Sequence, residues 1–255
     1  MAQWRLVRLT VARHSLGAVP WRARGTRAVL FDLDGTLLDT AGDIAVALNR
    51  ALAERGLSAV PLDVVRTLVG RGARVLVERA LAFAAAGGTP PSPEPLVARY
   101  LFHAERLYDT GEASAAPFPG VCAALGQLRE RRLSLAVVTN KQRRLAVRAL
   151  DANGLLAAFE LVQGGDSCAR IKPDPEPLWQ ACRGLGIAPP EALMVGDSAN
   201  DVMAARAAGM AVVCVRHGYN AGQPVEALPV DALIGTLDEL PGLVDTDGRV
   251  DSTVG

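Results

Sequence analysis

Short apolar runs alternate with helical patterns over most of the chain. The runs are four to six residues long, which is typical of strands buried on both faces of a parallel sheet. We predict strands at 28–31, 133–138, 159–163, 192–195 and 211–215. Apolar residues at helical spacing predict helices between them, at 121–132, 141–153, 175–184 and 201–208. This alternation indicates an α/β fold with a doubly wound parallel, Rossmann-like sheet.

The segment between the first two predicted strands has a different pattern. Residues 43–112 show helical spacing and no convincing strand, with helices expected at 43–55, 73–86 and 96–109. We therefore predict a small helical cap domain inserted after the first strand. The expected boundaries are 42–116 for the cap, 27–41 and 117–244 for the catalytic core, 1–26 for a disordered N-terminal extension and 245–255 for a C-terminal tail.

The charge and cysteine content of the 255-residue chain exclude several classes of partner. The 27 basic residues balance the 27 acidic ones, so nothing indicates nucleic acid or an anionic membrane surface as a partner. No apolar run approaches the ~18 residues of a membrane span. The four cysteines are spaced for neither a zinc site nor a redox motif, which favours a reducing cytoplasm. We expect a cytoplasmic monomer or homodimer.

Polar clusters follow several of the predicted strands. Asp32 and Asp34 lie in FDLDGTLLDT directly after the first strand, Thr139 follows the second, and Asp197 and Asp201 follow the fourth in GDSAND. The carboxyl ends of parallel strands share one edge of the sheet, so these side chains should converge there. Clustered carboxylates repel one another and are costly to bury, so a compensating cation is expected.

These motifs, in this order, resemble those of the haloacid dehalogenase-like hydrolase superfamily over about residues 27–242. DxDGT resembles the first motif, Thr139 the second, Lys172 the third and GDSxxD the fourth. The resemblance implies that Asp32 is a nucleophile and that Asp34 is the general acid and base. Thr139, the backbone N–H of Asn140 and Lys172 would hold the transferring phosphoryl group.

The same resemblance implies a divalent cation as cofactor. A phosphate monoester and a carboxylate nucleophile are both anionic, so a metal must screen their repulsion. Asp32, the backbone carbonyl of Asp34, Asp197 and Asp201 offer the hard oxygen ligands that suit Mg²⁺, with Asp201 binding directly or through water.

The predicted cap indicates a substrate class. LVGRGARVLVERAL, at 68–81, is similar to the cap of bacterial phosphoglycolate phosphatases, which implies a small phosphorylated metabolite, 2-phosphoglycolate, as substrate. Arg71 or Arg74 could then pair with the substrate carboxylate. Alternatively, both arginines are solvated at a break between helices. Lys141, one of only two lysines in the chain, is open to a substrate or a surface role.

Other functions remain as alternatives at this point. A phosphatase of another small phosphate, such as a sugar phosphate, or a phosphomutase would share nearly every core residue. A dehalogenase has no need of an acid at Asp34. A phosphonatase requires a cap lysine, and residues 43–112 contain none. A binding protein without activity would be expected to have lost one of the key residues, and all are present.

Overall fold

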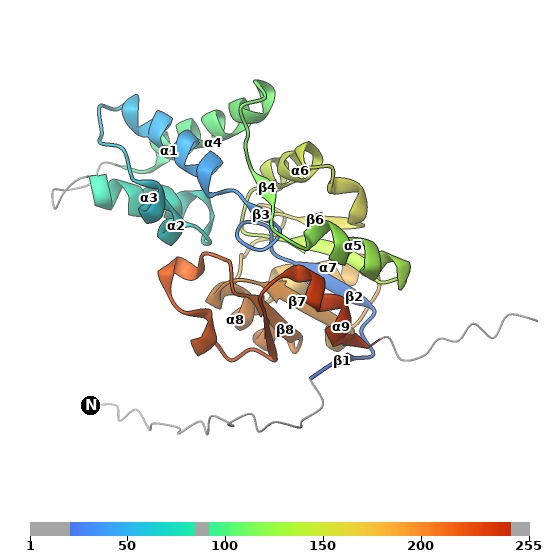
Figure 1. Ribbon diagram of the computed structural model, residues 1–255. Coiled ribbons are helices and arrows are strands. Elements are labelled where there is room, and N and C mark those ends of the chain that lie inside the picture. Colours follow the sequence, from blue (N-terminus) through green and yellow to red (C-terminus); the bar gives the residue numbers. More distant parts are fainter. Residues whose placement is uncertain (1–20, 85–91, 246–255) are drawn as a thin grey trace, which may run out of the picture.

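The computed structural model, shown in Figure 1, describes residues 21–84 and 92–245. Its central sheet has six parallel strands in the order β6-β5-β2-β7-β8-β9. Their bounds are β2 Ala28–Phe31, β5 Ser134–Val138, β6 Leu161–Gln163, β7 Ala192–Gly196, β8 Ala211–Val215 and β9 Ala232–Ile234. The predicted α/β fold with a parallel sheet is confirmed. The expected extension up to residue 20, the end of the helix predicted at 73–86 and the tail from residue 246 lie outside the described residues.

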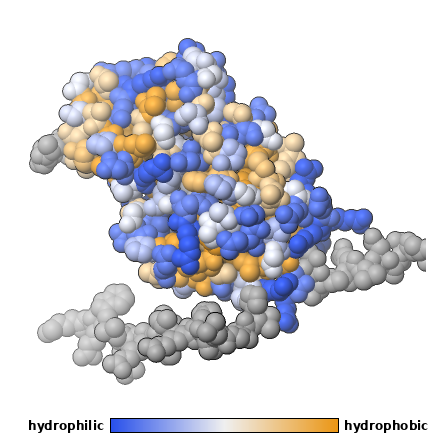
Figure 2. Space-filling model, in the orientation of Figure 1, coloured by the Kyte–Doolittle hydropathy of each residue, from blue (hydrophilic) through white to orange (hydrophobic). Residues whose placement is uncertain are grey.

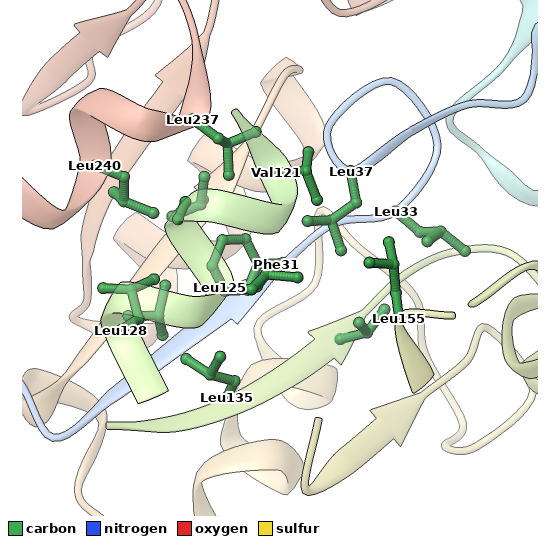
Figure 3. Packing of buried hydrophobic residues seen from close by; sticks show 14 of the residues in the cluster. Phe31, Leu33, Leu37, Val121, Leu125, Leu128, Leu135, Leu155, Leu237 and Leu240 are labelled. Atoms are coloured by element: carbon green, nitrogen blue, oxygen red, sulfur yellow. The ribbon is translucent and has the colours of Figure 1, made fainter. Parts of the chain in front are cut away.

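Helices cover both faces of this sheet because each central strand is apolar on both sides. Val29 and Phe31 of β2 contribute to one hydrophobic cluster, and Leu30 between them contributes to another. On the Phe31 face, Leu125 and Leu128 pack over the strands (Figure 3). That face carries α5 (Val121–Glu130), α6 (Arg143–Ala152) and α9 (Leu240–Leu243), and the opposite face carries α7 (Glu176–Leu185) and α8 (Ala199–Ala208).

The segment after β2 forms a group of four helices beside the sheet (Figure 1). They are α1 (Ala41–Ala53), α2 (Leu62–Leu68), α3 (Gly72–Ala84) and α4 (Glu94–Asp109). Ile44, Leu48 and Leu52 form one buried stripe along α1 and share a hydrophobic cluster with the other three helices. Tyr219, which follows β8, is the member of this cluster that comes from the sheet side.

The two chain segments that join these helices to the sheet lie side by side. β3 (Leu38–Asp39) and β4 (Ala116–Pro117) form a two-residue antiparallel pair in which Leu38 is opposite Pro117. The connection therefore consists of paired strands.

The structure differs from the predicted elements at three further places. Helix α2 was missed because its seven residues bury only one side chain, Val65, which leaves a weak periodic signal. Strand β9 was not predicted either, and it is only three residues long. β1 (Ala23–Arg24) pairs with β10 (Val244–Asp245), so strand pairing extends just beyond the boundaries predicted at 27 and 244.

The surface has a mixed character. On the face shown in Figure 2, hydrophilic and hydrophobic residues are interspersed over the helical group and the sheet region. Among residues 21–84 and 92–245, no helix is both long and apolar enough to cross a bilayer.

Candidate active site

The polar residues predicted to converge do so at the carboxyl ends of the central strands. Asp32 follows β2, Thr139 follows β5, and Asp197 follows β7. β2 lies between β5 and β7, where the strand order reverses, which is the position at which doubly wound sheets bind ligands. Residues from distant parts of the sequence are therefore brought to one place.

Lys172 is the buried cation of this cluster. Its residue exposure is only 1%, and Nζ donates hydrogen bonds to Oδ1 of Asp201 (2.6 Å) and to the carbonyl oxygen of Val138 (2.7 Å). Nζ also lies 2.9 Å from Oδ1 of Asp32. Burial lowers the pKa of Lys172, but the charges of Asp201 and Asp32 outweigh it and raise the pKa above its usual value. The ammonium therefore stays charged.

Asp201 holds the loop after β7 together. It is completely buried, and its Oδ2 accepts hydrogen bonds from Oγ (2.7 Å) and the backbone N–H (3.1 Å) of Ser198. These bonds belong to a capping box at the start of α8, a pattern that S-x-x-D at 198–201 would have allowed us to predict. The helix start thus fixes Asp201 opposite Lys172.

Asp197 is held from two directions. Oγ1 of Thr36 donates a 2.9 Å hydrogen bond to its Oδ1, and the backbone N–H of Tyr219 donates a 2.7 Å bond to its Oδ2. Burial, together with the charges of Asp201 and Asp32, raises the pKa of Asp197 to about 8. Close packing also matters here, because a side chain at Gly218 would overlap with Asp197.

Three buried carboxylates could hold a metal ion. One oxygen from each of Asp32, Asp197 and Asp201 lies within 4.8 Å of the other two. Oδ1 of Asp32 is buried and, despite its proximity to Lys172, has no partner in hydrogen-bond geometry among the described residues. Burial raises the pKa of Asp32 to about 6, although Lys172 opposes this effect. An unpartnered carboxylate oxygen in an all-oxygen donor set fits a hard divalent cation.

Asp34 lies at the rim of the cluster. Its Oδ1 accepts hydrogen bonds from Oγ1 of Thr40 (2.6 Å) and from Nζ of Lys141 (2.9 Å). Burial lowers the pKa of Lys141, but the charge of Asp34 outweighs it and raises the pKa above its usual value. A charged lysine therefore lies beside the carboxyl group predicted to act as acid and base.

The loop after β5 connects the sheet to the helical group. The side-chain amide of Asn140 donates to the carbonyl oxygens of Gly70 and Lys172, both at 2.8 Å, and its Oδ1 accepts from the backbone N–H of Lys172 (2.9 Å). The side chain of Asn140 is thus structural. Substrate binding by its backbone N–H stays a prediction.

A small pocket lies between this loop and the helical group, with a cavity volume of about 40 Å³. Its wall includes Asp32, Asp34, Thr139, Asn140, Lys141, Gly70 and Tyr100. Arg71 and Arg74 are not part of that wall. Arg71 is exposed, and Arg74 forms ion pairs with Glu78 and Glu94, so the structure does not bring either to the predicted carboxylate position.

The family model described as "Haloacid dehalogenase-like hydrolase" matches residues 29–215 of the chain, which include Asp32, Asp34, Thr139, Lys172, Asp197 and Asp201. The chain belongs to the haloacid dehalogenase-like hydrolase family. It is therefore an enzyme of the hydrolase class, as the motifs predicted.

Individual relatives of this hydrolase agree with the predicted resemblance. A plasmid-encoded protein named phosphoglycolate phosphatase, from Cupriavidus necator, is 46% identical over 85% of this chain and 92% of its own. A protein of the same name from Nitrosospira multiformis is 43% identical over 86% and 95% of the two chains. The crystal structure of a predicted phosphoglycolate phosphatase from Haemophilus somnus aligns with a TM-score of 0.79 at 32% identity, covering 85% of this chain and 96% of that chain. The similarity to bacterial phosphoglycolate phosphatases is confirmed.

Two residues of the site went unnoticed at the level of sequence. Thr40 contacts Asp34, and the hydroxyl of Tyr219 accepts hydrogen bonds from the backbone N–H groups of Thr40 (2.9 Å) and Ala41 (3.0 Å). Nothing in the local sequence pairs residue 219 with residue 40, since only the folded sheet brings them together.

Proposed function

We propose that this hydrolase removes phosphate from a small phosphate monoester, and that 2-phosphoglycolate is the substrate and glycolate and phosphate are the products. The observation that carries the chemistry is the position of Asp32, buried at a strand end beside Lys172 and open to the pocket. The names of the relatives support the choice of substrate.

In the first step, a carboxylate oxygen of Asp32 attacks the phosphorus atom and forms an aspartyl-phosphate. The ester P–O bond breaks, and Asp34 gives a proton to the departing oxygen. Lys172 offsets negative charge on the phosphoryl group, and Thr139 with the backbone N–H of Asn140 holds its oxygens. Asp34 is two residues from the nucleophile and in the same pocket wall, which suits this role.

In the second step, water attacks the phosphorus atom of the aspartyl-phosphate. Asp34, now ionised, takes the proton from that water, and the bond between phosphorus and Asp32 breaks to release phosphate. Both steps use one acid–base group on the leaving-group side, so the cycle ends with Asp32 and Asp34 in their initial states.

We assign Mg²⁺ to Asp32, Asp197, Asp201 and the backbone carbonyl of Asp34. When bound, it would supply positive charge that screens the repulsion between the phosphate ester and the carboxylates. Thr36 and the backbone N–H of Tyr219 orient Asp197, and the capping box at Ser198 orients Asp201.

We further propose that residues 42–116 act as a cap over the substrate. The separate hydrophobic cluster of α1–α4, the paired linkers β3 and β4, and the pocket between helices and sheet support this role. Closure would exclude water from the aspartyl-phosphate until the leaving group has departed. The four free cysteines agree with the reducing cytoplasm as location.

The test is phosphate release by the purified protein, with Mg²⁺ and with EDTA, from a panel of esters. We expect strong preference for 2-phosphoglycolate over sugar phosphates, and loss of release in EDTA. Phosphate release from sugar phosphates instead would agree with the proposed mechanism but contradict 2-phosphoglycolate as the substrate. Conversion of β-glucose 1-phosphate to the 6-phosphate without phosphate release would show a phosphomutase.

A further inference from the structure

Both lysines of the chain lie in the active site, and only one of them has a role in the chemistry described above. Nζ of Lys172 donates hydrogen bonds to Asp201 and Val138 and forms an ion pair with Asp32. Lys141 lies on the pocket wall with a side chain that is 10% exposed. Every other basic residue outside the histidines is arginine, and none of the arginines within residues 21–84 and 92–245 forms part of the pocket wall.

Lys141 has hydrogen-bonding capacity to spare. Its ammonium group carries three N–H donors, and Asp34 is its one hydrogen-bond partner within residues 21–84 and 92–245. Asp34 does not depend on that contact for its position, because Thr40 donates to the same oxygen at 2.6 Å. Two N–H donors in a largely enclosed pocket favour an anionic ligand, since a buried donor without a partner is costly.

The position of Lys141 relative to Asp34 indicates which part of a substrate it would meet. Asp34 must approach the bridging oxygen of the ester in order to protonate it. In 2-phosphoglycolate, one CH₂ group separates that oxygen from the carboxylate. Nζ of Lys141 is 2.9 Å from Oδ1 of Asp34. It would therefore lie beside the leaving group, within reach of the carboxylate of the substrate.

In the part of the chain that the structure describes, the rest of the pocket wall offers no other cation. Ile44, Val69, Leu76 and Leu145 are apolar. Arg74 is already paired with two glutamates outside the wall. An anionic leaving group close to Asp34 would be repelled by that carboxylate unless a positive charge lay between them.

We propose that Lys141 binds the carboxylate of the substrate's leaving group and so gives the site its preference for a short anionic ester such as 2-phosphoglycolate. This inference rests on the proposed phosphatase function and specifies its selectivity. It replaces Arg71 and Arg74 as the carboxylate ligand.

The test compares two esters in wild type and in Lys141→Met, which removes the charge at similar length. The esters are 2-phosphoglycolate and ethyl phosphate, whose leaving group has no carboxylate. Loss of a hydrogen bond to a charged group should lower kcat/KM for 2-phosphoglycolate by about 10- to 100-fold, mainly through KM. The value for ethyl phosphate should fall less, because it loses only the effect that acts through the contact of Lys141 with Asp34, which is common to both esters. Lys141→Arg, which keeps a positive charge, should restore part of the preference.

A matched control removes a positive charge from the same helix region. Arg144 is exposed and pairs with Glu105, so Arg144→Met should leave both values unchanged. An equal fall for both esters in Lys141→Met would contradict the proposal, because it would mean that Lys141 only positions Asp34. A selective loss in Arg74→Met, with none in Lys141→Met, would also overturn it.

A binding measurement separates this proposal from the proposed function. Calorimetric titration of 2-phosphoglycolate into Asp32→Asn protein, with and without Lys141→Met, needs no turnover. If 2-phosphoglycolate binds in a way that depends on Lys141 but the wild type does not hydrolyse it, the role of Lys141 as carboxylate ligand is supported and the proposed phosphatase function is refuted. If 2-phosphoglycolate is hydrolysed equally well without Lys141, the proposed phosphatase function is supported and the role of Lys141 as carboxylate ligand is refuted.

Discussion

The hydroxyl group of Tyr219 donates a 2.6 Å hydrogen bond to Oδ1 of Asp39, although 180 positions separate the two residues in the sequence. The same hydroxyl accepts the backbone N–H groups of Thr40 and Ala41 at the start of α1, which has no side-chain cap of its own. At its other end, the backbone N–H of Tyr219 contacts Asp197. One residue of the loop after β8 therefore connects Asp197 to the start of α1.

Tyr219→Phe tests this connection. The change keeps the buried ring but removes the acceptor of the Thr40 N–H and leaves the Ala41 N–H with only a 3.4 Å hydrogen bond to Asp39. This loss should cost about 1–3 kcal/mol in the free energy of unfolding. Hydrogen exchange at Thr40 and Ala41 should become faster. Urea unfolding and exchange mass spectrometry measure the two effects. Tyr108→Phe is the control, since the hydroxyl of Tyr108 has no hydrogen-bond partner in the described part of the chain. Equal losses in the two variants would contradict the capping role.

Asp32→Asn tests the nucleophile. An amide cannot form the aspartyl-phosphate, so phosphate release should fall by at least about 10³-fold. The fold should remain, because the backbone N–H of residue 32 keeps its hydrogen bond to Val195 and the side chain nearly keeps its shape. Circular dichroism and a phosphate assay check both statements. Asp63→Asn, an exposed acid at the start of α2, should retain full activity. Activity in Asp32→Asn close to that of this control would refute the mechanism.

The sequence allowed these chemical residues to be predicted because each is positioned by a local signal. Asp32 and Asp197 follow apolar strands, so periodicity places them at the edge of the sheet. Asp201 was predicted because GDSAND resembles the fourth family motif, and the helix start that holds it is a local signal as well. Tyr219 and Thr40 escaped because their roles depend on which loops meet after folding. The helix expected from residue 141 begins at Arg143, because Asn140, Lys141 and Gln142 form the loop of the pocket. Only the side-chain geometry revealed that Lys141 faces the pocket while Arg74 pairs elsewhere.

Metal binding should be detectable without turnover. A cation that binds the folded protein alone raises its stability, by about 2.7 kcal/mol at a concentration 100-fold above Kd. Thermal unfolding in Mg²⁺ should therefore occur at a higher temperature than in EDTA. Asp197→Asn should abolish most of that difference, because it removes one of the three clustered carboxylates. An unchanged Mg²⁺ effect in Asp197→Asn would place the cation at another site.

Replacement by alanine should have opposite effects at Gly218, beside Asp197, and at Gly126, within α5. A methyl group at Gly218 would overlap with Asp197, so Gly218→Ala should displace that acid, weaken the stabilisation by Mg²⁺ and lower phosphate release. Gly126 lies exposed within α5, where an added methyl group meets open space. Gly126→Ala should stabilise the protein by about 0.5–1 kcal/mol, because alanine loses less backbone entropy in a helix. Urea unfolding of both variants, with and without Mg²⁺, measures the difference. A Gly218→Ala protein that keeps the full Mg²⁺ effect would show that Asp197 tolerates movement of this loop.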